Sequence, residues 1–407
     1  MSLTDERRWQ YHNPVRLIFG PGVLAELPRF VAGRRTLLVT TPGFTKRGIT
    51  DRLRRVPGIE LAVLDTVEPN PDLRAIEHDS LALLGEPFEL ILALGGGSSL
   101  DTAKALSLIL RAAVPDLLSA HFERGVALPA DEPLPVIAVP TTAGTGAEVT
   151  PFATVWDKRR GKKYSLAASG LHPRVALLDP ELTLTAPFDV TVASGLDALS
   201  HAFEAIWNRN STPVTTAYAT KAIRVILQTL PNLCDSLHNL AYRSRMMESS
   251  LMAGLAIAHT RTALAHSMSY PITSRRGMPH GLACGFTLPA LLAFNAEVDD
   301  GRLADLAREA GATSIQGLQD KLAELFASIG VGALLRAHVD SIDNLMDLIS
   351  EMITPGRAEN NLRPASDDDI STILRMAWSS TATAMAMSPV AASINYEDGD
   401  GRAGDTP

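Results

Sequence analysis

The chain has 407 residues, enough for two domains that each bury a core, and its composition is that of a globular protein. The net charge of −8 leaves no basic footprint, which argues against nucleic acid as a partner. No apolar run is long enough to span a membrane, and the polar N-terminus lacks the apolar segment of an export signal, so we expect no membrane partner. Two cysteines outside any CxxC pair fit a reducing cytoplasm, which is the expected location.

Short apolar runs alternate with helical patterns through the first half of the chain. Residues 17–22 indicate an early strand that ends in a turn. Buried strands are expected at 36–40, 61–64, 90–94 and 136–139, because near-continuous apolar runs are typical of a parallel sheet covered on both faces. Helical spacing occupies 72–84 and 101–113. The alternation predicts a doubly wound, mostly parallel α/β domain.

The second half of the chain differs in composition. From residue 189 to about 388 it is rich in Ala, Leu and Met and poor in strand-like runs, which predicts an all-helical domain. We therefore expect an α/β domain at 1–187, a helical domain at 188–394 and a disordered acidic tail at 395–407. Because no long linker separates the halves, we expect them to pack directly and to form a ligand cleft between them.

Two loops follow predicted strands. The first, LGGGSSLD at 94–101, opens a helix, where glycines and free amides would let a phosphate approach the backbone, although the pattern is not GxGxxG. The second, PTTAGTGAE at 140–148, offers threonine hydroxyls to ribose, phosphate or a nicotinamide amide. Either loop alone could be only a tight turn. Their positions at the ends of two strands of one sheet favour a shared ligand.

Four side chains could bind one divalent cation. Asp197 and His201 lie one turn apart on a predicted helix, so both leave the same face. His266 and His280 follow, and the second stands in Pro-His-Gly, a break that could turn its ring toward the first. A lone histidine is more often a surface or core residue. The four side chains occur together with the two loops, which favours a ligand site over four unrelated residues. Their three nitrogens and one oxygen suit Fe²⁺ or Zn²⁺.

The chain resembles a known family at this point. The blocks GGGSSLDTAKA, PTTAGTGAEVT, LLDPELTLTAP, GLDALSHAFEA and PHGLA, in this order, are similar to the iron-containing (group III) alcohol dehydrogenases. The resemblance implies a dinucleotide-binding α/β domain, an all-helical C-terminal domain and a divalent metal in the cleft between them. It implies NAD(P)H as cofactor, Fe²⁺ as the first choice of metal with Zn²⁺ as the alternative, and a homodimer or larger homo-oligomer.

The resemblance also assigns roles to matching positions. The implied metal ligands are Asp197, His201, His266 and His280. The implied pyrophosphate region comprises Gly95, Gly96, Gly97, Ser98 and Asp101, and the nicotinamide-side loop comprises Thr141, Thr142 and Thr145. Lys163 matches a lysine near the cofactor ribose.

Two positions depart from the family pattern. Tyr270 stands where many members have a second histidine, so the proton of the product alcohol is expected from water or from this phenol. Many NAD-preferring members carry an acidic residue after the second strand, where this chain reads Val39-Thr40-Thr41-Pro42. Without a carboxylate to repel a 2′-phosphate, the Thr41 position is expected to tolerate NADPH.

The segment HTRTALAHSMSYP at 259–271 resembles the phosphonoacetaldehyde reductase branch of the family. Arg261, Arg275 and Arg276 flank ligand positions, and an arginine fork could bind a phosphonate or carboxylate, although these side chains could equally be solvated or paired with acids. Arg261 is the preferred substrate contact. We expect interconversion of a small aldehyde and its primary alcohol, with an anionic aldehyde such as phosphonoacetaldehyde favoured.

Other functions stay open. A general alcohol dehydrogenase or a maleylacetate reductase of the same family would share most of these residues. Glycerol dehydrogenases and 3-dehydroquinate synthases share the architecture. A non-catalytic nucleotide- or metal-binding protein would bind the cofactor without turning over any carbonyl compound.

Overall fold

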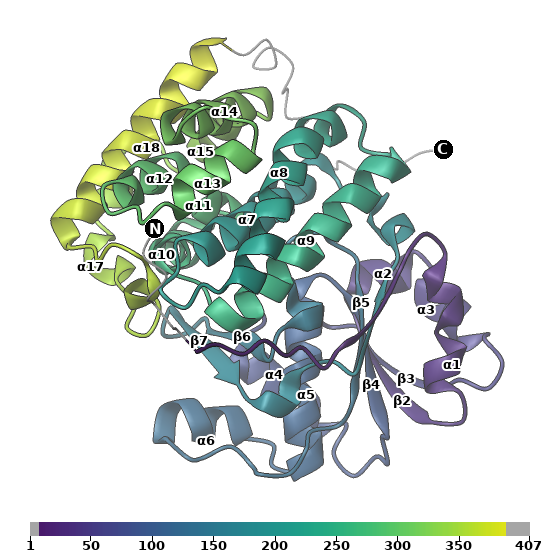
Figure 1. The fold of residues 1–407 in the computed structure, drawn as a ribbon. Coiled ribbons are helices and arrows are strands. Elements are labelled where there is room, and N and C mark those ends of the chain that lie inside the picture. The colour runs from purple at the N-terminus through teal and green to yellow at the C-terminus, as the bar shows by residue number, and fades with distance from the viewer. Residues whose placement is uncertain (1–7, 388–407) are drawn as a thin grey trace, which may run out of the picture.

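The computed structural model describes residues 8–387 (Figure 1), so the tail expected at 395–407 lies outside the described residues. A six-stranded parallel sheet, ordered β1-β8-β5-β4-β2-β3, forms the N-terminal half. Its strands are β1 (Arg16–Phe19), β2 (Arg35–Val39), β3 (Glu60–Leu64), β4 (Leu90–Gly95), β5 (Val136–Pro140) and β8 (Val175–Leu178). The predicted buried strands correspond to β2, β3, β4 and β5, which confirms the doubly wound α/β fold.

Helices cover both faces of this sheet, which accounts for its near-continuous apolar strands. Alternate residues enter two separate cores: Leu37 and Ile91 pack against α4 to α6, and Leu38 and Leu92 pack against α1 to α3. These helices are α1 (Pro28–Val31), α2 (Pro42–Lys46), α3 (Ile49–Arg54), α4 (Leu73–Leu81), α5 (Gly97–Ala112) and α6 (Leu117–Arg124).

An antiparallel hairpin of β6 (Phe152–Asp157) and β7 (Lys162–Ala167), which the sequence pattern did not predict, extends from the α/β half. Two side chains of α5, buried Lys104 and partly buried Asp101, hold it in place. Lys104 Nζ donates to the carbonyl oxygens of Thr150 and Phe152 at 2.8 and 2.9 Å. The Thr154 amide donates to Asp101 Oδ2 at 2.9 Å. The hairpin therefore has a fixed position beside the start of α5.

The C-terminal half is helical, as predicted, and surrounds one large apolar cluster. Figure 1 shows it lying to one side of the sheet, with α9 next to the α/β half. Its helices are α7 (Phe188–Ile206), α8 (Pro213–Asp235), α9 (Leu240–Thr260), α10 (Leu264–Arg276), α11 (His280–Gly285), α12 (Leu288–Ala296), α13 (Arg302–Glu309), α14 (Ile315–Ser328), α15 (Val331–Arg336), α16 (Asp343–Met346), α17 (Ile349–Met352) and α18 (Asp367–Met387).

The helices bear on the expected domain boundary and on whether any segment could span a membrane. Pro187, the last residue of the expected α/β domain, is the N-cap of α7, while the boundary itself stays a prediction. Within residues 8–387 no single helix is long and apolar enough to cross a membrane; α5 and α6 pass that test only as a pair bent by 102°.

Candidate active site

The four expected metal ligands come from three helices that meet at one point. Asp197 and His201 lie on α7, His266 lies in the first turn of α10, and His280 is the first residue of α11. Helices α7 and α11 approach closely because position 281 is glycine. A Cβ at Gly281 would lie 1.9 Å from the carbonyl oxygen of Ala193, so any larger residue would push α11 away.

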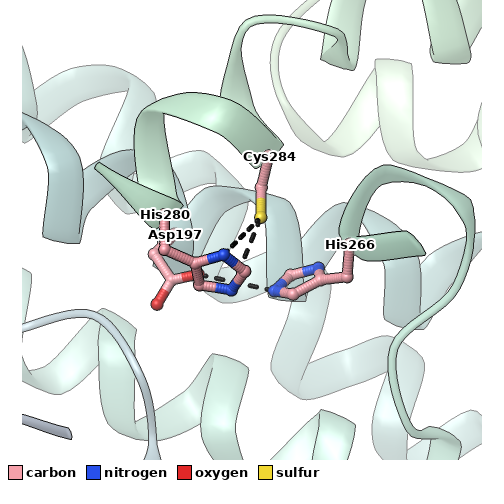
Figure 2. Close-up of side chains that lie close together, drawn as sticks. All are labelled: Asp197, His266, His280 and Cys284. Atoms are coloured by element: carbon pink, nitrogen blue, oxygen red, sulfur yellow. Dashed lines mark hydrogen bonds and ion pairs between the residues drawn. The ribbon is translucent and has the colours of Figure 1, made fainter. Parts of the chain in front are cut away.

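The side chains of Asp197, His266 and His280 converge (Figure 2), and the His201 side chain lies beside them. Asp197 Oδ1 lies 3.4 Å from His266 Nε2 and 3.8 Å from His201 Nε2. The imidazole ring of His266 stacks on that of His201 at a centroid distance of 4.6 Å and meets the ring of His280 edge-on at 5.2 Å. The structure thus brings all four predicted residues together.

Unsatisfied atoms in this cluster fit a cation. Asp197 Oδ1 and His266 Nε2 are buried, and neither forms a hydrogen bond with any residue in the described part of the chain. Buried polar atoms rarely remain without a partner, so each such atom needs an explanation. A divalent metal bound by one carboxylate oxygen and imidazole nitrogens would satisfy both atoms.

The protonation states of His201, His280 and Asp197 also suit metal binding. Burial lowers the pKa of His201 to about 4, and burial together with Lys163 holds the pKa of His280 well below its ordinary value. Both imidazoles are therefore neutral, which is the form that binds a metal. Burial alone would raise the pKa of Asp197, but the surrounding histidines outweigh it and keep this carboxylate ionised.

Two further residues belong to this cluster that the sequence reasoning missed. Glu204 lies on the same face of α7, and its Oε2 is 2.6 Å from His266 Nδ1. Cys284, one turn after His280 on α11, places its sulfur 3.7 Å from His280 Nε2, and its Sγ lies within 4.8 Å of donor atoms of Asp197, His266 and His280. Helical spacing from Asp197 and from His280 could have identified both.

A cleft of about 310 Å³ opens beside the cluster, between the α/β half and the helical half. Several residues of the two predicted cofactor loops line it together with the four expected ligands. The predicted cofactor residues in the lining are Gly97, Ser98, Asp101, Thr142 and Thr145 of the loops and Lys163 of β7. The cleft thus joins the proposed cofactor region to the proposed metal site.

The remaining predicted cofactor residues lie beside the cleft lining. Gly95 ends β4, and its carbonyl oxygen accepts from the amide of buried Thr141 at 2.9 Å, so the two loops are joined there. Gly96 is the N-cap of α5. Thr41 follows β2, and its neighbour Thr40 donates from Oγ1 to the carbonyl oxygen of Leu94 at 2.8 Å. The loops after β2 and β4 therefore meet where the strand order reverses, the usual position of a bound nucleotide.

Tyr270, on α10, lines the cleft and stacks on the His280 ring at a centroid distance of 6.0 Å. The ammonium of Lys163 lies 3.9 Å from the centre of the phenol ring. Burial alone would raise the pKa of Tyr270, but the Lys163 and Arg357 cations outweigh it and hold the pKa below its ordinary value. The phenol therefore lies in the cleft beside the His280 ring, with two nearby cations that favour its ionised form.

The three arginines predicted as substrate contacts do not line the cleft. Arg261 is exposed at the C-cap of α9. Arg275 pairs with Glu351 at 3.2 Å, and Arg276 donates to the carbonyl oxygen of Asn344 at 3.0 Å. The arginine that does line the cleft is Arg357, in the loop after α17, which no sequence pattern indicated.

Comparisons with known proteins agree with this architecture. The family model described as iron-containing alcohol dehydrogenase matches residues 14–180, and the model of the C-terminal region of the Fe-containing alcohol dehydrogenase family matches residues 191–378. The 1,3-propanediol dehydrogenase of Klebsiella pneumoniae is 31% identical over 91% of this chain and 99% of that protein. The phosphonoacetaldehyde reductase of Streptomyces viridochromogenes is 32% identical over 84% of this chain and 89% of that protein.

A solved structure has the same overall fold. The sulfoacetaldehyde reductase of Bifidobacterium kashiwanohense in complex with NAD⁺ is 31% identical, superposes with a TM-score of 0.82, and covers 92% of this chain and 99% of that one. Two family models together span most of the chain, and full-length relatives exceed 30% identity. The chain belongs to the iron-containing alcohol dehydrogenase family and is an oxidoreductase.

Proposed function

We propose that this protein reduces a small anionic aldehyde, such as phosphonoacetaldehyde, to its primary alcohol with NADH or NADPH. The observation that carries the proposal is the convergence of Asp197, His201, His266 and His280 at the edge of a cleft that both cofactor loops also line. The relatives that are named as reductases of phosphonoacetaldehyde and sulfoacetaldehyde support an anionic substrate.

The four donors would hold the metal, Fe²⁺ first and Zn²⁺ as the alternative. A bound divalent metal supplies Lewis-acid polarisation of the aldehyde carbonyl. The glycine and threonine loops would hold the nicotinamide, and the cleft would bring its hydride within reach of the carbonyl carbon. The hydride of NAD(P)H and one proton would reduce the aldehyde to the alcohol and leave NAD(P)⁺.

Tyr270 is the proposed source of that proton, directly or through water. Its ring lies against His280, so the phenol is close to the proposed metal ligands, and two cations lower its pKa. A donor whose pKa is brought closer to the working pH transfers its proton more readily. Lys163 and Arg357, the lysine and arginine among the cleft-lining residues, give this part of the cleft a positive charge.

A panel of aldehydes with NADH and with NADPH, assayed on metal-loaded protein, tests the proposal. We expect oxidation of the cofactor with phosphonoacetaldehyde or sulfoacetaldehyde at higher kcat/KM than with neutral aldehydes of the same length. Cofactor binding without turnover of any carbonyl compound would contradict it. Turnover of maleylacetate in preference to the short aldehydes would favour the maleylacetate reductase alternative. The homo-oligomeric state and the cytoplasmic location stay predictions.

A further inference from the structure

We propose that Arg357 recognises the anionic group of the substrate and sets the specificity of this site for short aldehydes that carry an oxyanion. The inference rests on the proposed function and adds the residue that binds the charged group of the substrate. The sequence pattern favoured Arg261 for this role because it lies close to the expected ligand His266 in the sequence. We now give the role to Arg357, which is far from His266 in the sequence.

The position of Arg357 supports the role. Its side chain lines the same cleft as Tyr270, His266 and His280. Its Nη1 donates to Thr262 Oγ1 at 2.7 Å, and the Thr262 side chain is buried just before the start of α10. Because α10 carries His266, this bond fixes the guanidinium relative to the proposed metal site.

The guanidinium also has unused donors. Among residues 8–387 the Thr262 hydroxyl is its hydrogen-bond acceptor, and no carboxylate lies within ion-pair distance of it. Its remaining N–H groups are therefore available to a ligand. A guanidinium presents its N–H groups as a planar fork that matches two oxygens of one phosphonate, sulfonate or carboxylate group.

The other charges in the cleft agree with an anionic ligand. Lys163 approaches the same Tyr270 ring from β7, at 3.9 Å from its centre. Of the acidic residues in the lining, Asp101 accepts from the Thr154 amide, Asp197 belongs to the proposed metal set, and Asp189 is exposed. None of them pairs with Arg357. Lys163 is close enough to Asp101 to lower its pKa, but neither Lys163 nor Arg357 forms an ion pair within residues 8–387. A substrate anion would therefore meet two cations, and of these Arg357 has no carboxylate partner in that part of the chain.

The arrangement also limits substrate length. Tyr270 contacts both the cationic region and the His280 ring, so one side chain bridges the anion site and the proposed metal site. The anionic group and the carbonyl group of one short aldehyde would then lie on either side of the Tyr270 ring. Phosphonoacetaldehyde and sulfoacetaldehyde are short aldehydes of this kind, and 3,3-dimethylbutanal is a neutral molecule of nearly the same shape.

The test compares Arg357→Gln with Arg261→Gln. The measured quantity is the ratio of kcat/KM for each anionic aldehyde to kcat/KM for 3,3-dimethylbutanal. We expect Arg357→Gln to lower this ratio by roughly ten- to more than a hundredfold, mainly through KM, because a charge-assisted bidentate contact is lost. Arg357→Lys should restore part of it, and Arg261→Gln should leave the ratio unchanged. A fall of the ratio in Arg261→Gln but not in Arg357→Gln would overturn the inference, as would equal losses on both kinds of aldehyde.

A binding measurement keeps the inference separate from the proposed function. Calorimetric titration of the metal- and NAD⁺-loaded protein with 2-hydroxyethylphosphonate and with isethionate, the two alcohol products, requires no turnover. We expect binding to wild type and at least tenfold weaker binding to Arg357→Gln. Unchanged affinity in Arg357→Gln would refute the role of Arg357 even if aldehyde reduction is observed. Weakened affinity without any aldehyde reduction would support an anion site and refute the proposed reaction.

Discussion

His266 Nδ1 lies 2.6 Å from Oε2 of Glu204, and the Glu204 side chain is fully buried. The other carboxylate oxygen of Glu204 accepts from the backbone amide of His266 at 3.1 Å. Glu204 therefore holds both the ring and the main chain of His266. Burial alone would lower the pKa of His266, but Cys284, Glu204 and Asp197 hold it above its ordinary value. With Nδ1 donating to Glu204, a metal would take the place of the proton on Nε2, the nitrogen that faces Asp197.

Glu204 should consequently act as a positioning residue for the metal site. We expect Glu204→Gln to weaken metal affinity by roughly 10- to 100-fold, because a neutral amide holds the imidazole less firmly than a carboxylate does. Competition with a fluorescent chelator measures the affinity directly, without an activity assay. Metal affinity equal to that of wild type would show that Glu204 only stabilises the fold.

Either His201 or Cys284 could be the fourth ligand of the metal, beside Asp197, His266 and His280. Burial raises the pKa of the Cys284 thiol, so its deprotonation on metal binding costs more than binding through the neutral imidazole of His201. We therefore assign the fourth ligand position to His201. We expect His201→Ala to lose stoichiometric metal and Cys284→Ala to retain it, as measured by elemental analysis after gel filtration. The reverse result would place the metal among Asp197, His266, His280 and Cys284 instead.

Thr41 should influence the choice between NADH and NADPH. It follows β2 at the point where the strand order reverses, near the expected adenosine ribose. Thr41→Asp should disfavour a 2′-phosphate by on the order of 1–3 kcal/mol, which is roughly a five- to 150-fold change in the ratio of catalytic efficiencies. Steady-state kinetics with both cofactors give this ratio, and no change would place Thr41 outside that pocket.

Asp101 should make stability depend on pH. Burial raises its pKa from 3.8 to about 6, despite the opposing attraction of Lys104. Between these values the folded chain holds a proton on Asp101 that the unfolded chain releases, so the contribution of Asp101 to the free energy of unfolding should fall as the pH rises from about 4 to about 6. His201 and His280, whose pKa values are lowered by burial, contribute the opposite slope. Burial also raises the pKa of Glu148. The test is therefore the difference in the free energy of unfolding between wild type and Asp101→Asn, measured by urea unfolding across this pH range. The free energy of unfolding of the variant, relative to that of wild type, should rise across this pH range, and a difference that does not change with pH would contradict the assignment to Asp101.

Local sequence patterns predicted most strands of the sheet but missed strand β8 and the hairpin of β6 and β7. The strands β2, β4 and β5 were predictable because apolar side chains on both faces produce continuous runs. The hairpin of β6 and β7 was missed, since its strands mix charged and apolar residues and its position depends on Lys104 of α5. The short strand β8 was missed because four apolar residues alone do not distinguish a strand from a helix.

The site was predictable only as far as sequence distance reflects spatial distance. Asp197 and His201 share a helix face, which spacing reveals. Arg275 is close to His266 in sequence, but nine residues of helix at about 1.5 Å each carry it more than ~13 Å along the axis of α10. Arg357 reaches the cleft because the loop after α17 returns to Thr262, a long-range contact without a local signal.

Turnover measured against added Fe²⁺ tests the central claim most directly. The protein is stripped with a chelator, and NADH oxidation with the best aldehyde of the panel is followed as Fe²⁺ is added under anaerobic conditions. Four donors converging on one point predict no turnover in the stripped protein and a rise that stops at one equivalent of metal per chain. Full turnover by the stripped protein, or none at any level of Fe²⁺ or Zn²⁺, would contradict a metal-dependent reductase built on Asp197, His201, His266 and His280.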